Sequence, residues 1–284
     1  MNTNGTKAAA SWKPACVLSI AGSDSGGGAG LQADIKTVSA LGGYSATAVS
    51  AVTVQNTLGV RQVMPVPAPT VCAQVQAVLD DIRPQAVKIS MLPDPETTEP
   101  LATILRKQDN IVIDPVMVAT SGHSLVENSA MRHIVKNLFP LARIVTPNLE
   151  ETRALTGIFP QKKTEFERAA KMILDMGPQA VLLKGGHSAS TRRSSDYLLC
   201  AEADFAPLVV SSPKSDSNNL HGTGCTLSAA IAFFLASGND LTAAVVAAKD
   251  YIYHAIKTGK NMQIGQGHGP VNHLFAPKAL KKLK

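Results

Sequence analysis

One segment of the chain passes from a glycine turn directly into small, apolar, helix-forming residues, and a thiol stands at the junction. Gly222, Thr223 and Gly224 precede Cys225 there. Glycines permit a tight turn whose backbone N–H groups face one point, and a helix start adds unpaired donors and a positive dipole end. The segment therefore predicts an anion site, and the helix start is expected to favour ionisation of Cys225, a candidate base or nucleophile. The alternative is a glycine turn before a core helix in which Cys225 only packs.

A second glycine-rich segment lies near the amino terminus, between a predicted strand at residues 16–21 and a predicted helix that begins near residue 31. It runs from Gly22 to Gly30. No Gly-Lys-Ser/Thr sequence closes it and its glycines lack the dinucleotide-binding spacing, so both of those phosphate loops are excluded. We expect the loop backbone to approach a small ligand, with Asp34, one helical turn further on, accepting hydrogen bonds from it. A flexible turn followed by a solvated acid is the alternative.

These two segments need a framework that holds them, and the remaining sequence supplies a regular one. Strands are predicted at 47–55, 86–89, 111–114, 142–146 and 180–184, and helices near 70–82, 96–107, 128–137, 149–155, 164–176, 223–237 and 240–258. This alternation predicts an α/β fold with a mostly parallel central sheet and helices on both faces. Ligands of such sheets bind at the carboxyl ends of the strands. Polar residues cluster there in this chain, at Gln55, Lys88, Asp114, Asn148 and Lys184.

Composition narrows the class of protein. The 284 residues are 45% hydrophobic and 17% charged, which suits one α/β domain, and no apolar run reaches membrane-spanning length. The amino terminus lacks the pattern of a secretion signal, so a cytoplasmic protein is expected. The cysteines show neither zinc-binding spacing nor a Cys-x-x-Cys pair, and all are expected to be reduced thiols. They are Cys16, Cys72, Cys200 and Cys225.

The net charge of +6 lies in the two ends of the chain. Two lysines within residues 1–13 and four within 278–284 account for it, because the other 21 basic residues match the 21 acidic ones. A nucleic-acid partner is therefore not expected, and few aromatic side chains are present to stack on bases. We expect a disordered extension at 1–13, one folded domain at 14–277 and a basic tail at 278–284.

Seven segments carry a more specific pattern when they are taken together and in order. They are AGSDSGGGAGLQADIKT at 21–37, VQNT at 54–57, KISML at 88–92, DPVM at 114–117, TPNLEE at 146–151, KGGH at 184–187 and HGTGCTLS at 221–228. This set resembles the hydroxymethylpyrimidine and phosphomethylpyrimidine kinases of thiamine biosynthesis, which belong to the ribokinase-like superfamily. The resemblance extends from about residue 15 to about residue 275. It implies a single-domain, three-layer ribokinase-like sandwich.

The resemblance implies that Gly222, Thr223, Gly224 and the Cys225 amide form an anion hole for a transferring phosphoryl group. Rigid backbone donors suit a reaction in which charge on the phosphoryl oxygens must be neutralised in place. Many superfamily members carry an aspartate base where Cys225 stands. The resemblance therefore implies that Cys225 removes the proton from the substrate hydroxyl.

Three further groups of site residues follow from the resemblance. The pyrimidine is expected against Gly22, Ala29, Asp34, Gln55, Met91 and Val116, with the Gln55 amide pairing with its amino edge. ATP is expected against Asn148, Lys184, Gly186, Thr223 and Lys249. Magnesium is expected at Glu151, with Asp114 as a second acid near the metal or phosphates. The alternatives are ordinary core for Met91 and Val116, a turn-capping carboxylate for Asp114, and a solvated lysine for Lys249.

The expected function is ATP- and Mg²⁺-dependent phosphorylation of 4-amino-5-hydroxymethyl-2-methylpyrimidine and of its monophosphate, giving the diphosphate. A pyridoxal or pyridoxine kinase shares the fold and is the alternative within enzymes. A module that binds the pyrimidine without turnover is the alternative from another class. The resemblance also implies a homodimer, and the polar loops near 117–127 and 187–195 are expected to act as lids.

Overall fold

Nine strands form one sheet, in the order β3-β2-β1-β4-β5-β6-β7-β8-β9. The computed structural model describes residues 11–117, 128–185, 192–202 and 207–283. The strands are β1 (Cys16–Asp24), β2 (Tyr44–Asn56), β3 (Gly59–Pro65), β4 (Ala86–Ile89), β5 (Ile111–Ile113), β6 (Ile144–Val145), β7 (Ala180–Lys184), β8 (Arg193–Cys200) and β9 (Leu208–Pro213).

The sheet is mixed, which corrects the expectation of a mostly parallel one. The strands from β2 through β1, β4, β5 and β6 to β7 are parallel neighbours. In contrast, β3 pairs antiparallel with β2, and β8 and β9 add two antiparallel strands at the other edge. All the predicted strands lie in the parallel part. The sequence pattern does not predict the edge strands, because many of their residues face solvent and no continuous apolar run marks them.

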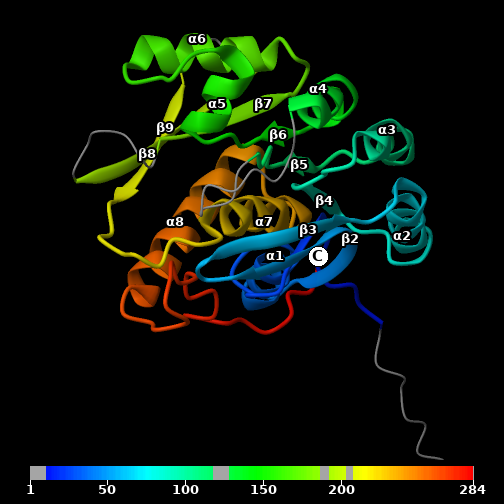
Figure 1. Ribbon diagram of the computed structural model, residues 1–284, viewed down its shortest axis with the longest axis horizontal. Coiled ribbons are helices and arrows are strands. Elements are labelled where there is room, and N and C mark those ends of the chain that lie inside the picture. The colour runs from blue at the N-terminus through cyan, green and yellow to red at the C-terminus, as the bar shows by residue number, and fades with distance from the viewer. Residues whose placement is uncertain (1–10, 118–127, 186–191, 203–206, 284) are drawn as a thin grey trace, which may run out of the picture.

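Helices cover both faces of this sheet, as expected (Figure 1). They are α1 (Gly30–Ala40), α2 (Ala68–Asp81), α3 (Thr98–Leu105), α4 (Asn128–Asn137), α5 (Leu149–Thr156), α6 (Lys163–Leu174), α7 (Thr223–Ala236) and α8 (Leu241–Gly259), with short 3₁₀ turns η1 (Pro95–Thr97) and η2 (Phe139–Leu141). One apolar core lies between the sheet and α2, α3, α4 and α6. A second lies between the sheet and α1, α7 and α8. Within the described ranges, no helix has the length and apolar character needed to cross a membrane.

Helix α7 is apolar on all sides, which is typical of a helix that is buried all round. It packs against α1 and α8 and against β1, β4 and β5. Ala230, Ile231 and Ala232 have no exposed surface. This packing holds the amino end of α7, where Gly222 is the N-cap residue, in a fixed position.

The lysine-rich segment at 278–283 is attached to the fold. The Lys278 N–H donates to the Ala40 carbonyl at 2.8 Å, and the Leu283 N–H donates to the Lys13 carbonyl at 3.0 Å. The expected domain boundary after residue 277 therefore does not mark the end of the folded part. Most of the predicted extension, residues 1–10, lies outside the described residues.

A buried histidine next to the first turn of α7 is expected to make the fold sensitive to acid. Burial, with the charges of Lys36 and His221, lowers the pKa of His273 from 6.5 to about 4. Its Nε2 lies 3.1 Å from the Thr226 hydroxyl oxygen. The unfolded chain takes up this proton at a higher pH than the folded one. The stability from the neutral ring is thus present above pH 6.5 and lost as the pH falls through 4, by up to about 3 kcal/mol.

Urea unfolding at pH 7.5 and 5.0 tests this expectation. His273→Gln should lose less stability than the wild type over this interval, because glutamine can hydrogen-bond Thr226 without titrating. His254→Gln is the matched control, since His254 is 42% exposed on α8, and it should keep the wild-type pH dependence. An equal loss in the wild type and His273→Gln would show that His273 is not responsible.

Candidate functional site

The start of α7 is held against the glycine loop that follows β1. Gly222 has a φ of 82°, a conformation that side-chain-bearing residues rarely adopt. A Cβ at this position would overlap the carbonyl oxygen of Gly28 and lie 3.2 Å from Cα of Ala29. Helix geometry leaves the N–H groups of Gly224 and Cys225 without a partner inside the helix. The turn therefore has the form that an anion site needs.

Three ionisable side chains approach this turn. A Cβ on Gly224 would lie 3.3 Å from both Asp114 Oδ2 and Lys184 Nζ. Asp114 directly follows β5, and Lys184 is the last residue of β7. Lys184 Nζ donates to Asp114 Oδ1 at 2.7 Å and lies 3.9 Å from Glu151 Oε2. Asp114 has no exposed surface and Glu151 is 5% exposed. The Lys184 ammonium therefore lies close to two buried carboxylates, those of Asp114 and Glu151.

Burial and the neighbouring charges shift the pKa values of Glu151 and Lys184. Burial raises the pKa of Glu151 to about 7, while Lys184 lowers it and Asp114 raises it further. Burial alone would lower the pKa of Lys184, but the carboxylates of Asp114 and Glu151 outweigh this effect and raise it. The lysine is thus firmly charged. The two carboxylates together carry more negative charge than the lysine neutralises.

Asp114 and Glu151 supply the kind of ligand that Mg²⁺ takes. This ion prefers oxygen, and proteins commonly bind it through one or two carboxylates together with substrate phosphates and water. In the part of the chain that the structure describes, no group of three or more His, Cys, Asp or Glu could hold a metal ion. The two carboxylates and their surplus negative charge fit the binding mode that uses phosphate and water as the remaining ligands.

The surroundings of Cys225 correct one expectation from the sequence. Burial raises the pKa of this thiol to about 11. The Lys88 ammonium and the Gly30 N–H lower the pKa, whereas the carboxylates of Asp34 and Asp114 raise it. The expectation that the helix start makes the thiol ionise more readily than a free one is therefore wrong here. Burial and the two carboxylates favour the neutral thiol. Together they outweigh the amino end of the helix, which favours the thiolate.

A buried ion pair lies near this thiol. Lys88 Nζ donates to Asp34 Oδ1 and Oδ2 at 3.0 and 2.9 Å and to Ser90 Oγ at 3.0 Å. Neither charged side chain has exposed surface, so the alternative of Asp34 as a solvated acid is wrong. Burial alone would lower the pKa of Lys88, but Asp34, Cys225 and Asp114 raise it. Sequence reasoning assigned no role to Lys88, although a lysine inside an apolar strand pattern is a signal for a buried partner.

The glycine loop folds around the side chain of Asp24. Its Oδ1 accepts from the Gly26 N–H at 2.8 Å, and its Oδ2 accepts from the Gly28 and Ala29 N–H groups at 3.0 and 2.8 Å. His221 Nε2 lies 2.9 Å from the same Oδ2. Burial opposes ionisation, but the bonds from His221 and the loop outweigh it and lower the pKa of Asp24. Sequence reasoning missed both side chains, although an aspartate just before a glycine run is typical of such a turn.

The residues expected around the acceptor lie in two places. Gly22, Gln55, Met91 and Val116 lie at or just after the ends of β1, β2, β4 and β5, and Ala29 and Asp34 lie at the N-cap of α1 and in its first part. A Cβ on Gly22 would lie 2.8 Å from Met91 Sδ. Met91 is 6% exposed, whereas Val116 and Gln55 are half-buried. The core alternative for Met91 is compatible with this burial, and its sulfur also faces the glycine loop.

Asn148 and Glu151 bind each other at the start of α5. Asn148 Oδ1 accepts from the Glu151 N–H at 2.9 Å, and Glu151 Oε2 accepts from the Asn148 N–H at 2.7 Å. This reciprocal pair is a capping box. It fixes the carboxylate of Glu151 beside Lys184.

Lys249 is connected to the site through the side chain of Asp196. Its Nζ donates to Asp196 Oδ2 at 2.7 Å and to Ser194 Oγ at 3.0 Å, so the alternative of a solvated lysine is wrong. The other oxygen, Asp196 Oδ1, accepts from the Gly185 N–H at 3.0 Å. Lys249 therefore supports the backbone that follows Lys184. Gly186 and most of the loops expected as lids lie outside the described residues.

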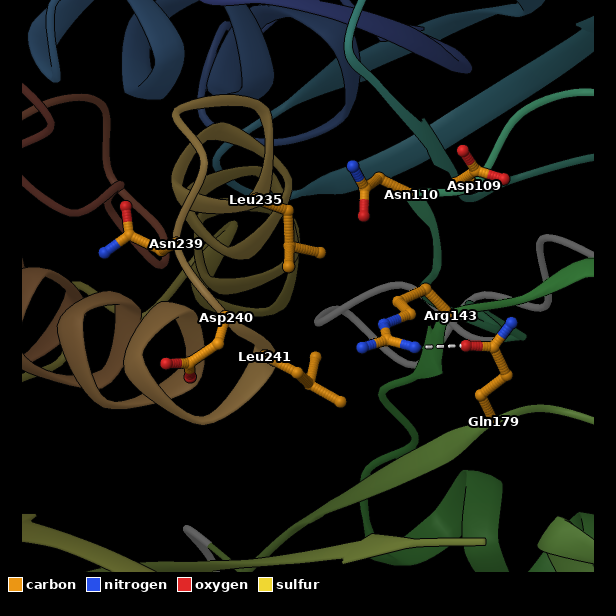
Figure 2. Close-up of a pocket in the computed structure, with 8 residues that line it drawn as sticks. All are labelled: Asp109, Asn110, Arg143, Gln179, Leu235, Asn239, Asp240 and Leu241. Atoms are coloured by element: carbon orange, nitrogen blue, oxygen red, sulfur yellow. Dashed lines mark hydrogen bonds between the residues drawn. The ribbon is translucent and has the colours of Figure 1, made fainter. Parts of the chain in front are cut away.

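A separate pocket of about 320 Å³ lies at the other ends of the central strands, beside the amino ends of β5, β6 and β7 (Figure 2). In it, the Arg143 guanidinium donates to the Gln179 amide oxygen, and Asp240 caps α8 by accepting from the Ala243 N–H at 2.8 Å. The other lining residues are Asp109, Asn110, Leu235, Asn239 and Leu241. The predicted site residues do not line this pocket.

Most of the predicted site residues gather instead at the carboxyl ends of the central strands and the adjoining helix starts. They are Gly22, Ala29, Asp34, Gln55, Met91, Asp114, Val116, Asn148, Glu151, Lys184, Gly222, Thr223, Gly224 and Cys225. Lys249 is not one of this group and is connected to the backbone after Lys184 through Asp196.

A family model described as phosphomethylpyrimidine kinase matches residues 24–272. The chain belongs to the phosphomethylpyrimidine kinase family. A hydroxymethylpyrimidine/phosphomethylpyrimidine kinase of Rhizobium meliloti (strain 1021) is 47% identical over 262 residues, which cover 91% of this chain and 97% of the relative. The enzyme of that name from Haemophilus influenzae is 43% identical, with 90% and 96% covered. The predicted family and enzyme class are thereby confirmed.

Solved structures of related kinases share the fold. Phosphomethylpyrimidine kinase from Clostridium difficile 630 is 40% identical, with a TM-score of 0.73 and coverage of 85% of this chain and 99% of that one. Pyridoxal kinase from Staphylococcus aureus, in complex with pyridoxal, is 31% identical, with a TM-score of 0.83 and coverage of 97% and 98%. This phosphomethylpyrimidine kinase family member therefore also resembles vitamin B6 kinases in structure.

Proposed function

We propose that this kinase transfers the terminal phosphoryl group of ATP, with Mg²⁺, to 4-amino-5-hydroxymethyl-2-methylpyrimidine and then to its monophosphate. The observation that carries the proposal is that the start of α7 faces Lys184 and Asp114, with Glu151 beside them. Backbone donors, a cation and two carboxylates suit a phosphoryl group whose charge must be neutralised in place. A module that only binds the pyrimidine has no need of this set.

Each group has one task in this proposal. The N–H groups of Gly224 and Cys225, at the positive end of α7, bind the oxygens of the transferring phosphoryl group. Lys184 neutralises charge on the nucleotide phosphates. Mg²⁺, when bound through Asp114 and Glu151, supplies additional positive charge to those phosphates. Asn148 holds Glu151 in place through the capping box.

Cys225 receives the proton of the attacking hydroxyl in this proposal. As the new oxygen–phosphorus bond forms, the bond between the phosphoryl group and ADP breaks, and the hydroxyl proton moves to Sγ of the thiolate. A thiolate whose conjugate acid has a pKa near 11 is a strong base, although only a small fraction of such a thiol is ionised at neutral pH. Lys88, paired with Asp34, favours the thiolate because it is the nearby positive charge that lowers this pKa.

A product assay tests the proposed function. Purified protein, magnesium-ATP and hydroxymethylpyrimidine are followed over time so that mono- and diphosphate are measured separately. We expect the monophosphate to appear first and the diphosphate later. Lys184→Met serves as the control for contaminating kinases and should lose nearly all product. Absence of ATP consumption with this acceptor and with other hydroxymethyl heterocycles would instead favour a binding module.

Pyridoxal is the second candidate acceptor. Pyridoxal kinases from Bacillus subtilis and Staphylococcus aureus both have TM-scores of 0.83 to this chain, against 0.73 for the C. difficile pyrimidine kinase. We infer that hydroxymethylpyrimidine and pyridoxal can be compared directly as acceptors of this chain. The side chain that separates the two candidates in this proposal is Gln55, because an amide offers both a donor and an acceptor to an aminopyrimidine edge.

Gln55→Ala is expected to lower kcat/KM for hydroxymethylpyrimidine by about 10- to 100-fold more than kcat/KM for pyridoxal. The reason is that the aminopyrimidine loses two directional contacts, whereas pyridoxal has no exocyclic amine to lose. Both acceptors are measured on both proteins, so that pyridoxal is the internal control for folding. An equal loss, or a larger one for pyridoxal, would favour the vitamin B6 kinase.

The proposal also includes a homodimer, which the family resemblance supports, and a cytoplasmic location, which is the expectation from the sequence. Two plant relatives are named as chloroplastic bifunctional enzymes, so location varies among relatives. Light scattering of the purified protein measures the oligomeric state, with twice the chain mass of 29.7 kDa expected.

A further inference from the structure

Four side chains form a line of contacts between the glycine loop, the start of α7 and the end of β2. Asp24 Oδ2 lies 2.9 Å from His221 Nε2, and this nitrogen lies 3.3 Å from Gln55 Nε2. At the other end of the amide, Gln55 Oε1 lies 3.2 Å from Thr53 Oγ1, which lies 2.9 Å from the Ser23 carbonyl oxygen. The line therefore ends in a carboxylate on one side and a carbonyl on the other. Neither end group has a proton to donate.

The proton of the Thr53 hydroxyl is used at the Ser23 end. A carbonyl oxygen only accepts, so the 2.9 Å contact requires the single O–H of Thr53 to donate to Ser23. The hydroxyl then has only lone pairs left for Gln55. A donor, the amide nitrogen, is therefore the better neighbour for Thr53 than the amide oxygen. The chain contains the same arrangement elsewhere: the Thr98 hydroxyl donates to the Pro95 carbonyl and accepts from the Asn137 amide nitrogen, each at 2.9 Å.

The proton on His221 is fixed by the opposite end of the line. Asp24 already accepts three backbone N–H groups, which is the environment of an ionised carboxylate. Because this carboxylate has no proton, His221 Nε2 must carry the one that the two share. A protonated ring nitrogen cannot accept from a second donor. The amide atom that faces His221 is therefore expected to be the oxygen.

The two ends thus require the same orientation of the amide. Oxygen and nitrogen of a glutamine amide are nearly equal in size, so hydrogen-bond partners decide which atom faces which neighbour. We infer that Gln55 presents its amide oxygen to His221 and its nitrogen to Thr53, the reverse of the atom order in the contacts above. Asp24, His221 and Thr53 are then positioning residues that hold this amide in one orientation.

The inference deepens the proposed function and rests on it for its consequence. One lone pair of the amide oxygen and one N–H remain for an acceptor ring. The contacts with His221 and Thr53 fix the oxygen on the His221 side and the N–H on the Thr53 side. An aminopyrimidine edge must present its own donor and acceptor in the matching order, whereas a ring without such an edge gains little from it. The selectivity attributed to Gln55 is therefore expected to depend on Thr53, which need not touch the substrate.

Nuclear magnetic resonance of the ligand-free protein tests the orientation without any activity. With ¹⁵N-labelled histidine, and His221→Gln to assign the signal, the neutral ring of His221 should carry its proton on Nε2. With ¹⁵N-labelled glutamine, the Gln55 NH₂ protons should show Overhauser contacts to the Thr53 side chain. An unprotonated Nε2, or NH₂ contacts to the His221 ring instead of Thr53, would overturn the inference.

Kinetics of three threonine variants test the consequence. Thr53→Val removes the partner of the amide nitrogen and is expected to lower kcat/KM for hydroxymethylpyrimidine about 10-fold relative to that for pyridoxal. Thr53→Ser keeps the hydroxyl and should restore the wild-type ratio. Thr98→Val, at the matched arrangement away from the site, should leave the ratio unchanged. If Thr53→Val leaves the ratio unchanged too, the positioning role is overturned. If the wild type phosphorylates neither acceptor, the proposed function fails, while the resonance experiment still decides the orientation.

Discussion

Gly222→Ala is expected to lower kcat at least about 100-fold, the range measured when one oxyanion donor is lost from an active site. A Cβ at Gly222 would overlap the carbonyl oxygen of Gly28, so the glycine loop and the start of α7 would have to separate. Separation moves the N–H groups of Gly224 and Cys225 away from the phosphoryl group. Turnover of hydroxymethylpyrimidine under saturating magnesium-ATP measures the effect.

The other end of the same helix supplies a matched control. Gly238 follows α7 with a φ of 85°, nearly that of Gly222, but a Cβ there would meet nothing within 4 Å. Gly238→Ala should therefore cost about 1–2 kcal/mol of stability from backbone strain and leave kcat near the wild-type value. Urea unfolding of both variants separates strain from loss of the site. Similar kcat values for the two variants would show that the contact with Gly28 does not matter for turnover.

Cys225→Ala is expected to lower kcat by about 100- to 10,000-fold while the affinity for ATP stays near its wild-type value. Removal of the thiol leaves no group at this position that can accept the hydroxyl proton. Cys225→Asp should recover part of the rate, because a carboxylate can accept the proton and the resemblance implies an aspartate here in related kinases. Cys225→Ser is the control for size, since a hydroxyl of similar volume does not ionise usefully. Normal turnover by Cys225→Ala would show that the thiol only packs.

The pH profile provides a second measure of the same role. Burial raises the pKa of the Cys225 thiol to about 11, so the ionised fraction grows throughout the range from pH 7 to 9. If the thiolate is the base, kcat of the wild type should rise with pH over this range. The rise should be absent from Cys225→Asp, whose carboxylate does not titrate there as a thiol does. A flat wild-type profile would contradict the thiolate role.

The sequence predicts secondary structure best where all the residues that determine it lie in one short segment. The glycine turn and apolar helix at 222–236 predict both the position and the form of the helix start, and the apolar runs predict the central strands. The segment is less informative about the ionisation of Cys225. Lys88, Asp34 and Asp114 determine the charge around the thiol, and they come from β4, α1 and the end of β5. No local pattern reports which of these side chains will be neighbours.

The roles of Asp24 and His221 could not be predicted from the sequence, again because they depend on contacts between distant segments. Asp24 and His221 are separated by 197 residues, and their contact exists only when the glycine loop meets the start of α7. The edge strands β3, β8 and β9 were missed because solvent on one side allows polar residues in them. The mixed sheet follows from these three strands. Sequence patterns thus predict the buried centre better than the edges and long-range contacts.

The bridge that Asp196 makes between the Gly185 N–H and Lys249 has an evolutionary consequence. Both charged side chains are buried, and removal of one partner of a buried pair typically costs about 3–5 kcal/mol because the other is left uncompensated. Selection should therefore act on the two positions as a unit. Among homologous chains, a change at Asp196 should be accompanied by a change at Lys249, although the two residues are far apart in sequence. A lysine on α8 would then be inherited together with the strand residue that shapes the backbone after Lys184.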